Sequence, residues 1–205
     1  HPEWEGVAFR KGTLRLLDGE GGRRLGAFSD DLVFTRTGIS GPAALELSGP
    51  SEAARRRGRA YLVYDFADLT EADVDAELRH EQQKNPHLSI RTWLHRWLPE
   101  RVVESLGRAE GLPDLRLKAL PKGLRRTVVG WVCAFPLGGP GVVPLERGEV
   151  AAGGVALGAV DPHTMRVQNW ENLYVCGELL DVDGPVGGYN LQAAFSTGFV
   201  AGESV

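Results

Sequence analysis

The chain has 205 residues, of which 42% are hydrophobic and 24% are charged, as in ordinary proteins with one or two packed domains. Its net charge of −4 argues against a nucleic-acid-binding platform, and it has neither an 18-residue apolar run nor a secretory leader. We therefore expect a cytoplasmic protein with no nucleic-acid or membrane partner.

Alternating apolar residues predict strands near the N-terminal end. One or two strands are expected in residues 7–17 and another in 25–34, separated by a glycine-rich turn at 18–22. The apolar and aromatic residues 60–66 predict a further strand.

Capping residues predict where the helices begin. Ser40 is a candidate N-cap, and Pro42 suits the first turn of the helix after it. Thr70 with Asp73 resembles a capping box, and Ser89 is a candidate cap for the next helix. Residues 68–131 as a whole have helical spacing, and their tryptophans are expected in a core rather than a ligand cage.

Glycine-rich segments with short apolar runs follow. Residues 149–159 predict two strands around Gly153-Gly154, and Leu173–Cys176 predict a buried strand. The loop after Cys176 is rich in Gly and Asp and leads to a helix that opens at Gly187-Gly188. Such a helix start presents unpaired N–H groups beside a strand end, which is suited to an electron-rich or anionic part of a ligand.

Cysteine and histidine spacing indicates no other chemistry. Cys133 and Cys176 lack CxxC partners, so no disulfide framework or metal site is expected, and Cys176 is predicted to be a reduced core residue. The five histidines are not clustered, and the catalytic residues stay unknown at this stage.

Two segments resemble one protein family. The segment from 148 to 202, which includes GELLDVDGPVGGYNLQAAF, resembles the C-terminal signature of the bacterial HI0933-like flavoproteins, including the BaiN-type FAD-dependent oxidoreductases. The segment LVFTRTGISGPAALELS, residues 32–48, resembles an earlier element of the same family. Two long motifs in the family's order make a chance match improbable.

The resemblance implies an α+β protein. It implies a β-barrel-like domain in residues 1–67 and 132–148, with a small helical subdomain inserted at 68–131. Residues 149–205 would be the C-terminal strand, loop and helix of an FAD-binding Rossmann-like domain. The family's N-terminal GxGxxG unit has no counterpart in this sequence.

The same resemblance implies FAD as the cofactor of the complete protein. Gly187 and Gly188 would let the flavin approach the backbone, and the helix dipole would favour negative charge on its pyrimidine edge by about 0.3–1 kcal/mol. An acid after the strand would contact the ribityl or pyrophosphate part, with Asx turns as the alternative role. The candidate cofactor-binding residues are Gly153, Gly154, Gly177, Glu178, Asp181, Gly187, Gly188, Tyr189, Asn190 and Leu191.

Some roles stay open between ligand contact and structure. The Gly153-Gly154 pair equally fits a tight crossing or bulge of the backbone. Asn190 equally fits a helix cap.

Two functions remain. The first is part of an FAD-dependent oxidoreductase that transfers hydride to or from a small organic substrate, with NAD(P)H as donor or oxygen as acceptor. The second is a non-enzymatic fragment or interaction domain without bound cofactor. This chain alone is expected to lack tight FAD binding, because a dinucleotide crevice needs the first βαβ unit. A homo-oligomer, or a separate N-terminal half, would cover the open edges of the expected sheet.

Overall fold

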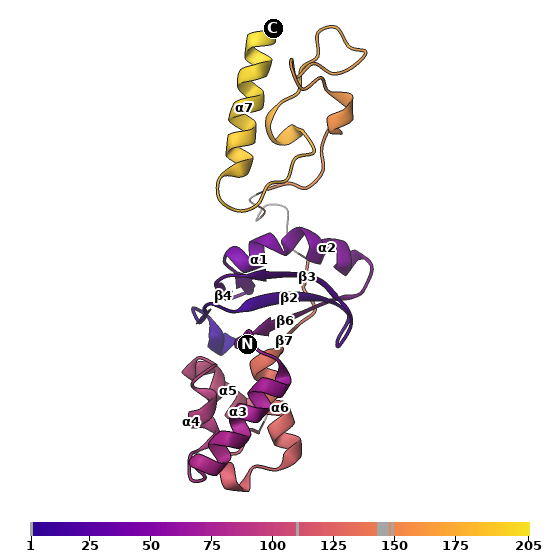
Figure 1. Cartoon of the computed structure of the whole chain (residues 1–205). Helices are drawn as coiled ribbons and strands as arrows, with labels where there is room; N and C mark the ends of the chain where they lie inside the picture. The colour runs from indigo at the N-terminus through magenta and orange to yellow at the C-terminus, as the bar shows by residue number, and fades with distance from the viewer. Residues whose placement is uncertain (1, 110, 143–147, 149) are drawn as a thin grey trace. The chain divides into compact units, whose positions relative to one another are not determined.

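The computed structural model describes residues 2–109, 111–142, 148 and 150–205 (Figure 1). The chain divides into two compact units, residues 1–141 and residues 142–205. Each unit has its own cluster of buried apolar side chains. The two units are therefore described separately.

An antiparallel four-stranded sheet forms the centre of the first unit. Its order is β3-β2-β6-β7, with the bounds β2 (Thr13–Asp18), β3 (Arg24–Ser29), β6 (Ala60–Asp65) and β7 (Phe135–Gly138). Leu14 and Leu16 are buried on one face of β2 while their neighbours are partly exposed, as a period of two requires. The expected strands in residues 7–17 and 60–66 are confirmed.

A second, smaller antiparallel sheet has the order β1-β4-β5. Its strands are β1 (Ala8–Phe9), β4 (Leu32–Thr35) and β5 (Gly38–Ser40). The single strand expected over 25–34 was wrong, because residues 25–29 belong to β3 and residues 32–34 to β4. Asp31 interrupts it by accepting hydrogen bonds from Arg10 and the Lys11 N–H.

The barrel-like arrangement is not confirmed. Among the described strands, β3 and β7 are the edges of one sheet, and the three-stranded sheet is separate from it. The strands of the smaller sheet have two to four residues, and no described strand pairs with strands of both sheets. Aromatic rings pack in this region instead, with Phe9 4.8 Å from Phe34 and 5.1 Å from Tyr64 between ring centroids.

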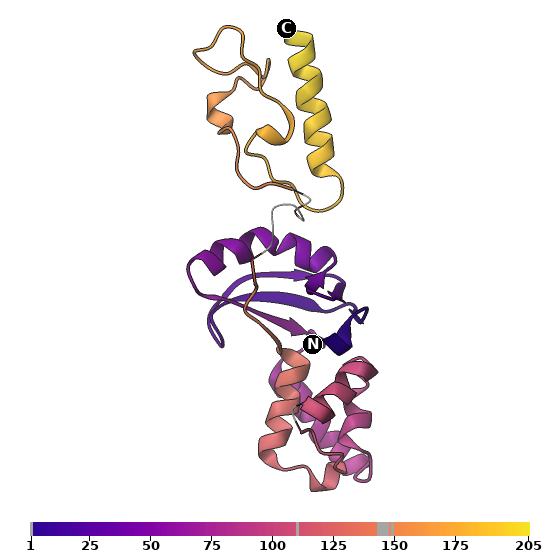
Figure 2. The same ribbon diagram turned by 180° about the vertical axis from the view of Figure 1, so that it is seen from behind.

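Helices α1 (Pro42–Glu46) and α2 (Ser48–Arg56) lie along one side of the four-stranded sheet, as both views show (Figure 2). Pro42 is the first residue of α1, as expected. Ser40 as N-cap was wrong, because it is the last residue of β5 and Gly41 is the N-cap. Gly41 has φ 98°, and a Cβ there would lie 2.8 Å from the Asp31 carbonyl oxygen, so only glycine suits this turn.

The helical segment contains α3 (Glu71–Lys84), α4 (Ile90–Leu94), α5 (Glu100–Ala109), the 3₁₀ turn η2 (Leu117–Ala119) and α6 (Lys122–Cys133). The capping box of Thr70 and Asp73 and the Ser89 cap are both confirmed. Trp93 is fully buried, which supports a core role for this tryptophan.

The helical segment is fastened to the sheets by specific contacts. The short 3₁₀ helix η1 (Pro2–Trp4) places the Trp4 Nε1–H 2.6 Å from Ser105 Oγ in α5. The buried Asp65, at the end of β6, accepts hydrogen bonds from the Ala67 and Asp68 N–H groups and pairs with Arg15. These bonds fix the exit of the chain from β6.

The second unit has little regular structure before its last helix. Its described elements are η4 (Leu157–Ala159), η5 (Gly177–Leu179) and α7 (Tyr189–Ser204), with isolated β-bridges between them. The two strands expected over 149–159 were wrong in the described part, which contains one bridge at Val155 and a 3₁₀ helix. Residue 149 lies outside the described residues.

The expected strand Leu173–Cys176 was also wrong. Only Tyr174 forms a bridge, antiparallel to Arg166, and it is flanked by two backbone hydrogen bonds. The buried-residue prediction for Cys176 was wrong as well, because this free cysteine is exposed. Apolar spacing alone did not predict which backbone segments would pair here.

Candidate cofactor-binding site

The start of α7 has the conformation that the glycine pair predicts. Gly187 has φ 133°, and Gly188 is the N-cap with φ 87°, values that strongly favour glycine. The first hydrogen bond of the helix joins the Gln192 N–H to the Gly188 carbonyl at 2.9 Å. The N–H groups of residues 189–191 precede that bond and have no partner within the helix, so they can face a ligand.

Asn190 fixes the loop before the helix. Its Oδ1 accepts from the Gly184 N–H at 2.8 Å, and its Nδ2 donates to the Gly184 carbonyl at 3.2 Å. Gly184 packs so closely that a Cβ on it would lie 2.9 Å from Tyr189 Cβ. Asn190 therefore binds the loop through both ends of its amide, a role other than the helix cap considered from the sequence.

Gly177 and Glu178 lie in η5, where α7 packs on the preceding chain. The Gly177 N–H donates to Thr197 Oγ1 at 2.9 Å, and a Cβ on Gly177 would meet the Ala194 side chain. The Glu178 carboxylate accepts from the Ala151 N–H at 2.7 Å. Both residues therefore have structural contacts, and ligand contact by either stays a prediction.

Gly154 lies at a tight backbone crossing. A Cβ on Gly154 would be 2.6 Å from the Leu179 carbonyl oxygen and 2.8 Å from the Asp181 nitrogen. Val155 N–H donates to Leu179 O at 2.8 Å, and Asp181 N–H donates to Val155 O at 3.0 Å. The crossing accounts for Gly154 without a ligand, whereas Gly153 has φ 94° and open space where a Cβ would lie.

The candidate residues thus fall in two places within the second unit. The crossing brings Gly154 beside Asp181, and η5 adds Gly177 and Glu178 to the chain that follows it. The start of α7 holds the other group, which comprises Gly187, Gly188, Tyr189, Asn190 and Leu191. Helix α7 connects the two groups, because Thr197 on it binds Gly177.

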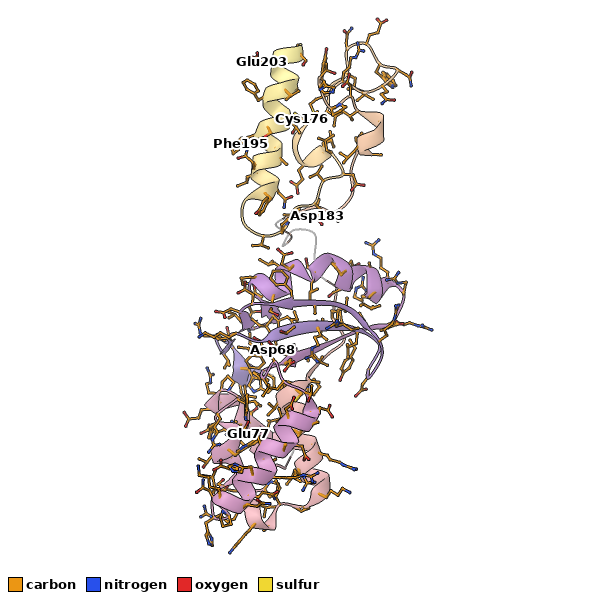
Figure 3. The ribbon with its side chains drawn as sticks, viewed as in Figure 1. Asp68, Glu77, Cys176, Asp183, Phe195 and Glu203 are labelled. Carbon is orange, nitrogen blue, oxygen red and sulfur yellow. The ribbon has the colours of Figure 1, made fainter. Side chains whose placement is uncertain are left out.

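Sequence reasoning missed the outer face of α7. Leu191, Phe195 and Phe199 are spaced by four residues and are 65%, 71% and 70% exposed. Figure 3 shows the Phe195 side chain directed away from the rest of the second unit. The opposite face carries small residues such as Ala201, which is buried.

The composition of α7 explains why this face is unusual. Glu203 is the only Asp, Glu, Lys or Arg between residues 189 and 204. A helix that is apolar on opposite faces is normally covered on both. Fully burying a large apolar side chain stabilises by about 1.5–3 kcal/mol, so this face is a strong candidate for an interface.

A comparison with known protein families shows to which family this chain belongs. The HI0933-like protein Rossmann domain matches residues 24–204. The chain belongs to the HI0933-like family. The family resemblance inferred from the two motifs is thereby confirmed, and the match extends across both units.

Similarity to characterised proteins extends over different lengths. The chain is 29% identical over 181 residues to the ribosomal RNA dihydrouridine synthase of Escherichia coli and 29% identical over 182 residues to that of Haemophilus influenzae. Both alignments cover 87% of this chain and 43% of the relative, so the chain spans less than half the length of these proteins. It is 49% identical to the 3-dehydro-bile acid delta(4,6)-reductase of Clostridium scindens over 59 residues, which are 29% of this chain and 14% of that protein.

No helix in the described part of the chain is both long enough and apolar enough to span a membrane.

Proposed function

We propose that this chain is part of an FAD-dependent reductase that adds two hydrogens to a carbon–carbon double bond conjugated with a carbonyl group. The observation that carries this proposal is the family match over residues 24–204, together with the names of the relatives. The flavin, when bound and reduced by NAD(P)H, would supply the hydride for such a reduction.

The names of the relatives share a chemical step. Making dihydrouridine from uridine saturates the uracil 5,6 double bond, which is conjugated with a ring carbonyl. A delta(4,6)-reductase of a 3-dehydro-bile acid acts on double bonds conjugated with the 3-keto group. In both cases hydride adds to the far carbon of the conjugated double bond and places negative charge on the carbonyl oxygen. A proton must then reach the carbon next to the carbonyl group.

The start of α7 suits the electron-rich edge of a flavin. Gly187 and Gly188 leave the approach free of side chains, and the N–H groups that follow lie at the positive end of the helix dipole. In this proposal Tyr189, Asn190 and Leu191 contribute backbone N–H groups, while Asp181 or Glu178 contacts the ribityl or pyrophosphate part.

The outer face of α7 is proposed to pack against the remainder of the flavin domain. A Rossmann-type domain needs a parallel sheet, and the described part of the second unit contains one parallel bridge, between Val155 and Leu180. Leu191, Phe195 and Phe199 offer the apolar surface that such a sheet requires. More than half of each dihydrouridine synthase lies outside its alignment with this chain, which is length enough for that sheet.

The favoured substrate is a uridine in ribosomal RNA. The dihydrouridine synthases align over 87% of this chain, whereas the bile-acid reductase aligns over 29%. This proposal replaces the small-molecule expectation. The net charge that predicted no nucleic-acid partner is unevenly distributed between the two units. NAD(P)H is proposed as the electron donor.

The test uses the complete protein that contains this sequence. It should purify with visible flavin absorption, oxidise NAD(P)H in the presence of unmodified ribosomal RNA, and raise the dihydrouridine content of that RNA by mass spectrometry. Protein without flavin would contradict the cofactor proposal. Flavin reduction without any change in the RNA would contradict the substrate proposal and favour a small conjugated ketone.

The variant Gly188→Asn tests the flavin position. Asn tolerates the left-handed conformation, so its main effect is to place a side chain where the flavin would approach. We expect most of the flavin to be lost from Gly188→Asn. The control Gly158→Asn, at a position with open space where a Cβ would lie, should retain its flavin. Equal flavin content in the two variants would place the flavin elsewhere.

A further inference from the structure

Positive charge is concentrated in one acid-free segment of the first unit. Residues 1–141 contain 21 Lys and Arg against 19 Asp and Glu, whereas residues 142–205 contain 2 against 8. No Asp or Glu occurs between Asp114 and Glu146. This interval contains Arg116, Lys118, Lys122, Arg125 and Arg126.

The part of this segment that lies in α6 lines a groove between α3 and α6. The groove has a volume of about 430 Å³ and is lined by acidic and basic side chains from both helices. The acidic ones are Glu71 and Asp75, and the basic ones are Arg79, Lys122, Arg125 and Arg126. The groove therefore has a net positive charge.

Asp75 is already paired within the protein. Its carboxylate lies 2.7 Å from Arg79 Nη2 and 2.8 Å from Arg125 Nε. These two pairs hold Arg125 and Arg79 at the groove wall and neutralise the acid between them. Asp75 thus does not offset the other cations of α6.

Lys122 and Arg126 form the exposed rim. They are four residues apart on α6, so they project from the same side of the helix. Both are exposed, as is Lys118 in η2, and none of the three has an ion pair within the described residues. Exposed cations with no acidic partner attract a polyanion through counterion release.

We propose that Lys118, Lys122 and Arg126 bind phosphate groups of the RNA substrate. This inference rests on the proposed function for the class of substrate, but the surface shares no residue with the candidate flavin-binding site, which belongs to the second unit. Contacts of lysine and arginine with phosphates carry no sequence information, so the surface positions the RNA and does not select its sequence. The groove itself is lined by charged side chains and suits a backbone that passes over it.

The test measures RNA binding by this chain, without turnover. A fluorescein-labelled hairpin of ribosomal RNA is titrated by fluorescence anisotropy at several KCl concentrations. The triple variant Lys118→Gln, Lys122→Gln, Arg126→Gln should bind more weakly. Each phosphate contact contributes about 0.7–0.9 to the slope of log affinity against log salt, so the slope should fall by roughly 2 to 3.

The matched control removes three other exposed cations of the same unit. Arg23, Arg24 and Arg36 are exposed and have no ion pair within the described residues, and their replacement by Gln changes the net charge equally. The control should retain most of the salt slope. Equal losses in both variants, or no RNA binding at low salt, would overturn the proposal.

Two further measurements separate the alternatives. Inorganic phosphate at matched ionic strength should not displace the RNA, and specific displacement would instead indicate a compact phosphate site. In the complete protein, flavin content and flavin reduction by NAD(P)H should be unchanged by the triple variant. Loss of those activities with intact RNA binding would refute the surface while leaving the reductase proposal in place.

Discussion

Replacement of Gly154 by alanine distinguishes a backbone crossing from a flavin contact. The added Cβ would lie 2.6 Å from the Leu179 carbonyl oxygen and 2.7 Å from the Leu180 carbonyl carbon. Both atoms belong to the backbone, so no side chain can rotate away to accommodate the methyl group. The two chain segments must separate.

The expected loss in free energy of unfolding follows from the contacts that this separation of the two segments disrupts. Overpacking costs about 1–3 kcal/mol. The crossing also holds two hydrogen bonds, from Val155 N–H to Leu179 O and from Asp181 N–H to Val155 O, each worth about 1 kcal/mol. We expect Gly154→Ala to lower the free energy of unfolding of the second unit by about 2–4 kcal/mol.

The assay combines urea unfolding with hydrogen exchange at the Val155 and Asp181 amides, which should exchange faster in the variant. Gly158→Ala is the control, because no atom lies within 4 Å of its added Cβ and its φ is ordinary. If Gly154→Ala and Gly158→Ala are equally stable, the crossing does not explain the glycine. Loss of flavin from the complete Gly154→Ala protein at unchanged stability would then support direct cofactor contact.

Three further predictions concern the first unit and the cysteines. Tyr64→Phe removes the hydroxyl that accepts from the Gly12 N–H at 3.0 Å, and should cost about 1–3 kcal/mol at pH 8 by urea unfolding. Burial raises the pKa of Tyr64 to about 12, so the wild type should lose stability as the pH rises from 10 towards 12, because the unfolded tyrosine ionises first. The variant should lose less stability over this range, and the loss that remains comes from other buried groups with raised pKa values, such as Cys133. The exposed Cys176 should react with a thiol reagent in the folded protein. Burial raises the pKa of Cys133 to about 11, so its thiol should react only when the protein unfolds. Prompt reaction of both thiols in the folded protein would contradict the burial of Cys133. Thr70→Ala should cost about 1 kcal/mol by loss of the capping box, and a thermal unfolding temperature equal to that of the wild type would count against it.

Local signals in the sequence predicted the first unit well. The Thr70 and Ser89 caps depend on hydrogen bonds to residues two or three positions away, so the sequence contains both partners. The alternation in β2 reflects one covered face, which Leu14 and Leu16 mark directly. The prediction of Ser40 as the N-cap was wrong because β5 extends to Ser40, and Gly41 is the N-cap instead.

The second unit was predicted less well because its pairings are not local. Leu173–Cys176 has the composition of a buried strand, but the described structure gives it one antiparallel bridge, and Cys176 is exposed. Its apolar residues are consistent with a sheet whose other strands are not among the described residues. The start of α7 was predicted correctly, since Gly187 and Gly188 adopt φ values that strongly favour glycine.

The roles of individual residues in the candidate site were also predicted poorly where they depend on non-local contacts. Asn190 was assigned to a flavin or a helix cap with equal weight, and its bonds to Gly184 could not be read from spacing. The apolar face of α7 was overlooked although Leu191, Phe195 and Phe199 recur every four residues.

Strands β6 and β7 are hydrogen-bonded neighbours, and Tyr64 faces Phe135 across that ladder. The chain therefore leaves the sheet at the end of β6 and returns to it at the start of β7, the neighbouring strand. Next to these two strand ends, the Phe66 N–H donates a hydrogen bond to the Val132 carbonyl. A tight hairpin could join the same two ends without shifting the register of a single strand. The helices between β6 and β7 could therefore change in length or sequence while the strand pairing of the sheet stays the same.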